Sequence, residues 1–325
     1  MKEVRPVFLF SLPRSGSTVV QRVLTSQGGM GSASEPWVLL PLLYMRKAEG
    51  VYAEYGQRTS AVAVSDFVGT LNGGEAAFRE ELARFVRRLY ARASGDETLL
   101  FLDKTPRYSL VAREIMELFP DGKFIFLWRN PLAVLASMIE TWGGGRWNAH
   151  RYRIDLFKGL ARLVDTCREA REKACAVRYE DVINSPETAF AKLFSYLELP
   201  FDAGSLEKFE SVKFSGRLGD PTGTREYRSL SSEPLDKWKN VLDNLLRKTW
   251  ARRYLQWIGE ERLALMGYDL GKLLEELRGS GSTVARLGSD LLRMIYGSLY
   301  AAAEVTVFRR KIRAMLRGEG VYPHT

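Results

Sequence analysis

Cysteine and histidine are rare in this 325-residue chain, which contains two of each. Cys167 and Cys175 are too few for a disulfide framework, and His150 and His324 cannot form a histidine-rich metal centre. We therefore expect no bound metal. We also expect any general base to be a carboxylate, because the other common candidate, histidine, is so scarce.

Long apolar runs are missing as well. No stretch of about 18 apolar residues occurs, so no transmembrane helix is expected. The first apolar run, residues 7–10, follows residues of mixed charge and is soon interrupted by Pro13 and Arg14. This pattern is typical of a strand and not of a secretory signal. The sequence therefore predicts a cytoplasmic protein, with peripheral membrane contact as an open alternative.

The net charge of +9 and the pI near 9.5 indicate an anionic partner. Nucleic acid is not expected, because the sequence has no zinc-finger spacing, no aromatic RNA-binding strand and no basic region leading into a zipper. A small anionic cofactor and an anionic membrane surface both fit the charge. Charge alone does not choose between them.

Apolar segments of strand length alternate with segments of helix length. Strands are expected at residues 7–10, 99–102, 123–128 and 174–178. Helices are expected at residues 17–26, 107–118, 132–142 and 148–173, with a helical hairpin at 62–71 and 75–93 and a flexible link at 28–34. The alternation predicts an α/β fold in which helices flank a central parallel sheet. Functional sites of such sheets lie at the carboxyl ends of the strands.

A separate amphipathic helix is expected near the C-terminal end. Residues 279–282 are Gly-Ser-Gly-Ser, and between residues 284 and 316 apolar residues recur three or four positions apart. The sequence therefore predicts a main domain at residues 1–279 and a helical appendage at residues 284–317. The apolar stripe fits packing on the main domain, pairing of two copies, or contact with a membrane surface. A basic cluster at the end of the helix would favour anionic lipids: Arg309, Arg310, Lys311, Arg313 and Arg317.

Residues 8–18 read FLFSLPRSGST, a short apolar strand, a turn of small residues and a helix start. Such a turn presents backbone N–H groups and the positive end of a helix dipole to a phosphate-like anion. The segment departs from the loop of nucleoside triphosphatases, because Ser11 replaces the first glycine, Ser17 replaces the lysine, and the cation is Arg14. Taken alone, the hexapeptide Pro-Arg-Ser-Gly-Ser-Thr at residues 13–18 could also occur by chance.

Polar residues follow the other expected strands too. Asp103-Lys104-Thr105-Pro106 follows the second strand, Arg129 the third, and Tyr179-Glu180-Asp181 the fourth. In a parallel sheet these ends line one crevice. A cationic crevice without a pair of acidic metal ligands fits an anion that is held without Mg²⁺.

Together these segments resemble the sulfotransferases that use 3′-phosphoadenosine 5′-phosphosulfate (PAPS). Residues 14–18 resemble their 5′-phosphosulfate loop, and residues 126–131 with Ser137 resemble their 3′-phosphate motif. Residues 178–182, with 186–187 and 197–201, resemble the next block of the family. The ordered occurrence of all three, over about residues 5–270, is more specific than any one. The loop Pro-Arg-Ser-Gly-Ser-Thr is most similar to the tyrosylprotein and bacterial carbohydrate sulfotransferases. The resemblance implies a P-loop-like sulfotransferase fold with residues 1–279 as its catalytic domain.

The resemblance also implies roles for individual residues. Five residues of the loop would bind the 5′-phosphosulfate: Arg14, Ser15, Gly16, Ser17 and Thr18. Arg129 and Ser137 would hold the 3′-phosphate, Tyr179 would line the nucleotide pocket, and Lys237 would close over the nucleotide.

One departure from the family bears on the chemistry. Cytosolic members carry a catalytic histidine two residues after a lysine, whereas this chain has Lys104-Thr105-Pro106, and proline cannot accept a proton. Glu35 stands where the tyrosylprotein branch carries its catalytic glutamate, so it is the expected base. Arg14 and Lys104 would neutralise charge as the acceptor oxygen attacks sulfur in line. Ser215 would add a hydrogen bond, as a comparable serine does in that branch.

The acceptor is the least determined part of the prediction. The expected substrate is a hydroxyl group of a carbohydrate, a lipid-linked molecule or a small metabolite. A phenolic, tyrosine-like hydroxyl is the alternative acceptor. A metal-dependent P-loop kinase and a non-catalytic nucleotide-binding protein are the alternative functions. Dimerisation through the C-terminal helix also stays open.

Overall fold

Five short strands form one sheet in which every hydrogen-bonded pair is parallel, in the order β2-β3-β1-β4-β5. The computed structural model describes residues 4–51, 53–95, 98–170, 172–212, 214, 233–302, 312 and 316. The strands are β1 (Arg5–Phe10), β2 (Met30–Ser32), β3 (Leu100–Asp103), β4 (Lys123–Trp128) and β5 (Ala174–Arg178). The register pairs Val7 with both Leu102 and Lys123. The predicted parallel α/β fold is thus confirmed.

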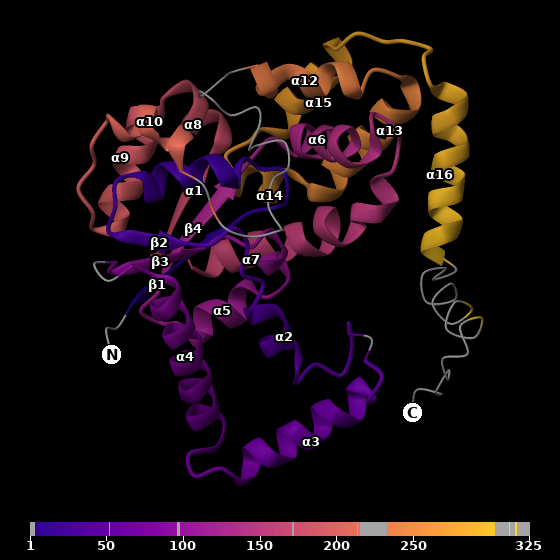
Figure 1. Ribbon diagram of the computed structural model, residues 1–325. Coiled ribbons are helices and arrows are strands. Elements are labelled where there is room, and N and C mark those ends of the chain that lie inside the picture. The colour runs from indigo at the N-terminus through magenta and orange to yellow at the C-terminus, as the bar shows by residue number, and fades with distance from the viewer. Residues whose placement is uncertain are drawn as a thin grey trace.

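Helices connect the strands and cover the sheet, as Figure 1 shows. The first half contains α1 (Ser17–Ser26), α2 (Leu39–Tyr44), α3 (Gln57–Thr70), α4 (Gly74–Ala93), η1 (Pro106–Leu110), α5 (Ala112–Leu118) and α6 (Pro131–Gly143). After it come η2 (Ala149–Tyr152), η3 (Ile154–Gly159), α7 (Leu160–Glu169), α8 (Tyr179–Asn184), α9 (Pro186–Leu197), α10 (Ser205–Lys208) and η4 (Phe209–Ser211). The last are α12 (Glu233–Val241), α13 (Leu245–Ile258), α14 (Glu260–Leu265), α15 (Leu270–Gly279) and α16 (Leu287–Ala302).

Alternating side chains of the strands divide the apolar interior into two cores. Phe8 and Phe10 of β1 point to one face of the sheet, where they pack with residues of α4, α5, α6, α7 and α13. Val7 and Leu9 point to the other face, where they pack with α1 and α9. Because side chains of a strand alternate between faces, a strand covered by helices on both sides must be apolar throughout. This explains the uninterrupted apolar run at residues 7–10 of β1.

The structure differs from the sequence prediction in three places. The expected flexible link contains β2, which pairs with β3 at one edge of the sheet. The expected long helix at residues 148–173 is divided into η2, the π-helical η3 and α7, and the expected helix at 107–118 into η1 and α5. The interruptions coincide with close packing of η1 on η3, where a Cβ on Gly159 would lie 2.8 Å from Ser109 Oγ.

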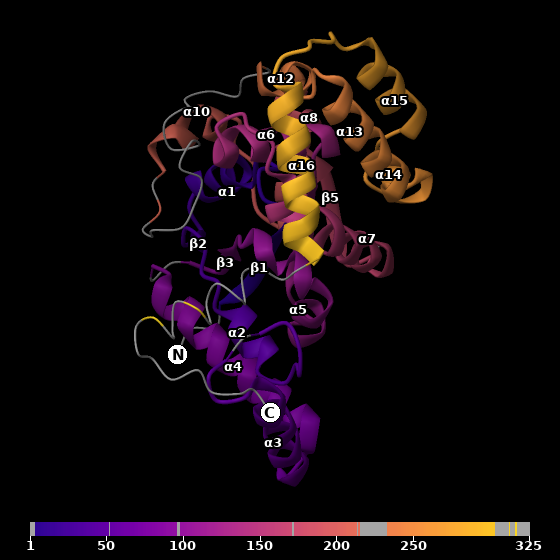
Figure 2. The same cartoon turned by 90° about the vertical axis from the view of Figure 1, so that its right-hand side faces the viewer.

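Two parts of the chain extend from this body in Figures 1 and 2. Helices α3 and α4 form the expected hairpin below the sheet, and α16 runs as a rod along the outside of the molecule. Helix α16 contacts η2 and α13. Over the residues described, no helix combines the length and the apolar character needed to cross a membrane.

Candidate functional site

The loop between β1 and α1 has the backbone of an anion cradle. Arg14 and Gly16 both have a positive φ, of 69° and 86°, so the chain turns sharply before α1 begins at Ser17. The N-cap of α1 is Gly16, so no side chain competes for the N–H groups of the first turn. These N–H groups, together with the helix dipole, favour an anion at this end of α1.

Tyr179, the first residue of α8, packs directly over this loop. A Cβ built on Gly16 would lie 2.2 Å from Tyr179 Cε2, a distance at which the two atoms would overlap. Ser15 and Ser17 are buried on either side of Gly16. The close approach of ring and backbone therefore requires glycine at position 16, in addition to the positive φ.

Two arginines come together here, one within this loop and one at the end of β4. Arg14 Nε donates a hydrogen bond of 3.1 Å to Ser137 Oγ on α6. Arg129, at the end of β4, donates from Nη1 to the Arg14 carbonyl oxygen at 2.9 Å, and its guanidinium carbon lies 4.6 Å from the centre of the Tyr179 ring. Arg129 is 5% exposed. The structure thus brings together the loop, Arg129, Ser137 and Tyr179, as the sequence predicted.

Glu35 and Lys104 meet beyond the ends of β2 and β3. Lys104 Nζ lies 3.1 Å from Glu35 Oε1, and the Trp37 indole Nε1 donates to Glu35 Oε2 at 3.0 Å. The Lys104 side chain is 2% exposed and that of Glu35 is 13% exposed. Both carboxylate oxygens of Glu35 are therefore oriented by partners, and the pair is largely shielded from solvent.

The buried carboxylate of Asp103 supports the Glu35–Lys104 pair. Asp103 is fully buried and accepts hydrogen bonds from Tyr90 Oη at 2.6 Å, Tyr108 Oη at 3.0 Å and Thr105 Oγ1 at 2.9 Å. Burial raises the pKa of Asp103 to about 6, against the opposing effect of the three hydroxyl donors. The network fixes the backbone on which Lys104 sits.

The Asp103 network also reaches the segment that carries Glu35. Tyr108 Oη accepts a hydrogen bond from the backbone N–H of Leu39 at 3.2 Å, and Thr105 Oγ1 accepts one from the backbone N–H of Trp37 at 3.3 Å. Sequence reasoning assigned no role to Asp103. The available signal is a carboxylate that directly follows the apolar run at residues 99–102.

Two further positioning residues were missed. Gln21 on α1 is buried, and its Nε2 donates to Ser32 Oγ and to the Ala33 carbonyl oxygen, both at 2.7 Å. These hydrogen bonds join α1, which follows the loop after β1, to the segment that leads to Glu35. Glu180 accepts from the Asn130 backbone N–H at 2.9 Å and from Tyr268 Oη at 2.5 Å, which joins the end of β4 to α8.

Three predicted residues remain: Thr18, Lys237 and Ser215. Thr18 is half-buried in the first turn of α1. Lys237 is exposed on α12, which packs on α6. Ser215 lies outside the described residues.

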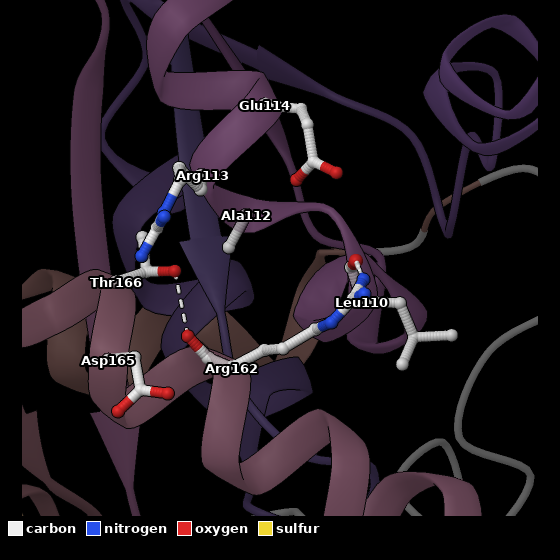
Figure 3. Close-up of a pocket in the computed structure, with 7 residues that line it drawn as sticks. All are labelled: Leu110, Ala112, Arg113, Glu114, Arg162, Asp165 and Thr166. Atoms are coloured by element: carbon white, nitrogen blue, oxygen red, sulfur yellow. Dashed lines mark hydrogen bonds between the residues drawn. The ribbon is translucent and has the colours of Figure 1, made fainter. Parts of the chain in front are cut away.

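Two cavities lie away from the anion loop, Arg129 and the Glu35–Lys104 pair. One, of about 260 Å³, is formed by α5, α7 and Leu110, and in Figure 3 the Thr166 hydroxyl donates to the Arg162 carbonyl oxygen at its wall. The other, of about 490 Å³, lies along β5 and is lined by residues of α8, α9 and α14. Neither contains a residue to which the sequence assigned a catalytic or nucleotide-binding role, although Asp181 lines the second.

Comparisons with known proteins match most of the chain to one family. The family model described as "Sulfotransferase family" matches residues 6–203. The nodulation protein NoeE of Sinorhizobium fredii is 32% identical over 42% of this chain and 31% of its own length. A putative protein-tyrosine sulfotransferase of Caenorhabditis briggsae is 23% identical over 74% of this chain and 84% of its own length.

Two other matches are relevant. The omega-hydroxy-beta-dihydromenaquinone-9 sulfotransferase Stf3 of Mycobacterium bovis is 30% identical over 38% of this chain and 34% of its own length. Among solved structures, the sulfotransferase domain from the curacin biosynthetic pathway aligns with a TM-score of 0.52 at 21% identity, over 74% of this chain and 92% of that domain. The structural match supports the fold, and the matched segment is about a third of NoeE and of Stf3.

Proposed function

Because this chain belongs to the sulfotransferase family, we propose that it transfers a sulfuryl group from PAPS to the hydroxyl group of an acceptor. The observation that carries the proposal is the convergence of Arg14, Arg129 and Ser137 at the N-terminus of α1. These groups belong to three different elements of the fold, and they offer cationic and hydroxyl donors to one anionic ligand.

The residues present fit a nucleotide with separate phosphate groups. The loop at residues 14–18 would hold the 5′-phosphosulfate, while Arg129 and Ser137 would hold the 3′-phosphate. Tyr179 presents a ring beside them, already in cation–π contact with Arg129. Ser17 in place of the P-loop lysine argues against a nucleoside triphosphate with Mg²⁺. When bound, PAPS supplies the sulfuryl group.

The other half of the site would act on the acceptor. Glu35 would take the proton of the acceptor hydroxyl, because it is a shielded carboxylate whose two oxygens are held by Lys104 and Trp37. Lys104 and Arg14 would stabilise negative charge that develops on the transferred group and its leaving oxygen. The hydrogen-bond network around Asp103 would keep Lys104 and the Glu35 segment in fixed relative positions, as a preorganised site requires. Ser215 and Lys237 remain proposed contributors on the strength of the sequence alone.

For the acceptor we propose a carbohydrate, lipid-linked or small-metabolite hydroxyl. The name of Stf3, which gives a hydroxylated menaquinone as substrate, supports a lipid-linked acceptor. A phenolic hydroxyl is the second candidate, since the relative named as a putative protein-tyrosine sulfotransferase matches 74% of this chain.

The test is incubation of the purified chain with PAPS and one acceptor from each class, with EDTA present, followed by mass spectrometry. We expect one sulfuryl group to be added to one class of hydroxyl, with release of adenosine 3′,5′-bisphosphate. A parallel thermal shift compares this bisphosphate with ATP and Mg²⁺, since a ligand of the folded state raises the melting temperature. A larger shift with ATP and Mg²⁺, together with no sulfated product, would overturn the proposal in favour of a P-loop kinase.

A further inference from the structure

Helix α16 is fixed to the protein by one face only. Its Asp290 is fully buried and pairs with the fully buried Arg247 of α13, with Nε–Oδ2 and Nη2–Oδ1 distances of 2.7 and 3.0 Å. Asn244 Nδ2 also donates to Asp290 at 2.8 Å. Two turns further along, Gly297 is so close to His150 that a Cβ would lie 2.8 Å from the imidazole. The inner face of α16 is therefore firmly docked.

The opposite face of α16 is apolar and exposed. Leu291 is 48% exposed, Leu292 71%, Ile295 51% and Leu299 64%. The spacing of three and four residues places these side chains on one side of the helix, away from Asp290 and Gly297. Figure 2 shows this helix running along the outside of the molecule.

No charged residue interrupts this exposed face. Within α16 the charged residues are Asp290 and Arg293, and the first is buried and the second half-buried. A helix that is apolar on its outer face as well as docked on its inner face is typical of a helix that is covered on both sides. The outer face of α16 is thus a contact surface for a partner.

Several cations lie beside this helix. Arg286, just before α16, donates from Nη1 to the carbonyl oxygen of Gly145 at 3.4 Å, which places it beside the exposed Arg146. Arg151 and Arg293 both lower the pKa of His150, whose ring packs against Tyr296, and burial contributes most to that shift. Arg153 lines a cleft together with Met294, Gly297 and Ser298 of α16. The nearby acid Asp243 accepts a hydrogen bond from the Thr283 hydroxyl.

We propose that the outer face of α16 docks the protein on an anionic lipid surface. An apolar helical face of this kind lies at the level of the lipid headgroups, and flanking cations add attraction to anionic headgroups. A second copy of the chain is the less suitable occupant, because a symmetric contact would bring two sets of these arginines together. The sequence after α16 adds five more basic residues, at 309–311, 313 and 317, which lie outside the described residues. This inference does not depend on the proposed chemistry.

The test measures binding of the full chain to vesicles by co-sedimentation. We expect binding to vesicles of phosphatidylglycerol and phosphatidylcholine that is about tenfold tighter or more than binding to phosphatidylcholine alone. The double variant Leu292→Glu/Leu299→Glu should weaken binding to the anionic vesicles by about tenfold or more, since it places charge on the apolar face. The matched control is Val62→Glu/Phe67→Glu, at two exposed apolar residues of α3, and it should bind like the wild type.

A second measurement does not depend on the double variant. Cys167 and Cys175 are both buried, so a fluorophore can be attached selectively to Leu292→Cys. We expect its emission to shift to the blue with anionic vesicles, as the probe leaves water. The proposal fails if the emission is unchanged or if the α16 double variant binds vesicles as tightly as the wild type. It also fails if, without lipid, the wild type is a dimer and the double variant Leu292→Glu/Leu299→Glu is a monomer. A second copy of the chain would then cover the outer face of α16.

Discussion

The ring of Tyr179 lies against the backbone of Gly16, leaving no room for a Cβ at position 16. The contact joins the first residue of α8 to the last residue before α1, two segments that are far apart in the sequence. It therefore fixes the shape of the loop between β1 and α1. A single methyl group added at position 16 would disturb that loop.

We predict that Gly16→Ala destabilises the protein by at least about 2 kcal/mol, because the new methyl group overlaps the ring and the backbone keeps a positive φ. The matched control is Gly28→Ala, since Gly28 also has a positive φ, of 83°, but nothing lies within 4 Å of the added Cβ. That variant should lose about 1 kcal/mol from backbone strain alone. Urea unfolding of both variants measures the difference, and equal losses would show that the contact with Tyr179 is soft.

The second prediction concerns the nucleotide. Arg129→Ala should weaken the binding of adenosine 3′,5′-bisphosphate by about 2 kcal/mol or more, a factor of about 30, because it removes a charge-assisted contact. Titration calorimetry with EDTA present measures the affinity. Arg113→Ala, at a largely exposed arginine of α5, serves as the control and should bind normally. If Arg129→Ala kept wild-type affinity, this arginine would have to be structural only.

The third prediction separates catalysis from binding. Glu35→Gln should lower turnover by roughly 10²-fold or more, the usual scale for loss of a general base. Affinity for the bisphosphate should change little, because the Arg14 and Arg129 cluster is untouched. Glu140→Gln, at an exposed glutamate of α6, is the control for loss of a carboxylate. Normal turnover of Glu35→Gln in a steady-state assay would exclude Glu35 as the base.

The fourth prediction uses the pH dependence of stability. Burial raises the pKa of Asp103 from 3.8 to about 6, so the folded state binds this proton more tightly than the unfolded state. The stabilisation by this group is therefore present at low pH and lost as the pH rises through about 6. Relative to Asp103→Asn, the wild type should gain about 2 kcal/mol as the pH falls from 7 to 4. Denaturant unfolding of both proteins at several pH values gives the comparison, and a constant difference would mean that the folded-state pKa is normal.

The fifth prediction addresses the buried ion pair of α16. Asp290→Ala leaves the Arg247 guanidinium buried without its carboxylate, which should cost about 3 kcal/mol or more. The double variant Arg247→Met/Asp290→Leu should recover part of this loss, since it removes both buried charges together. Hydrogen exchange over residues 287–302 reports whether α16 opens first. If the single and double variants were equally unstable, packing volume would be the cause.

The sequence predicted the strands near the site because residues 7–10, 100–102 and 124–128 are apolar and each run is followed by polar residues. It did not predict β2, since Met30–Ser32 is only three residues long and follows two glycines, which indicate a loop. The meeting of Arg14 with Arg129 follows from adjacent parallel strands. The Asp103 network could not be predicted in the same way, because Tyr90 belongs to α4 and its position depends on how that helix packs on the sheet.

Because β2 lies at the edge of the sheet, the proposed acceptor half and nucleotide half of the site should differ in how well they tolerate substitutions. The anion loop and Arg129 follow β1 and β4, each of which is hydrogen-bonded on both sides. Glu35 follows β2, which is paired on one side only. Edge strands open more readily than central ones, so local unfolding should reach the segment around Glu35 while the nucleotide half stays closed. Residues on the proposed acceptor side can thus be exchanged one by one in the search for a new acceptor, at little risk to the binding of the proposed sulfuryl donor.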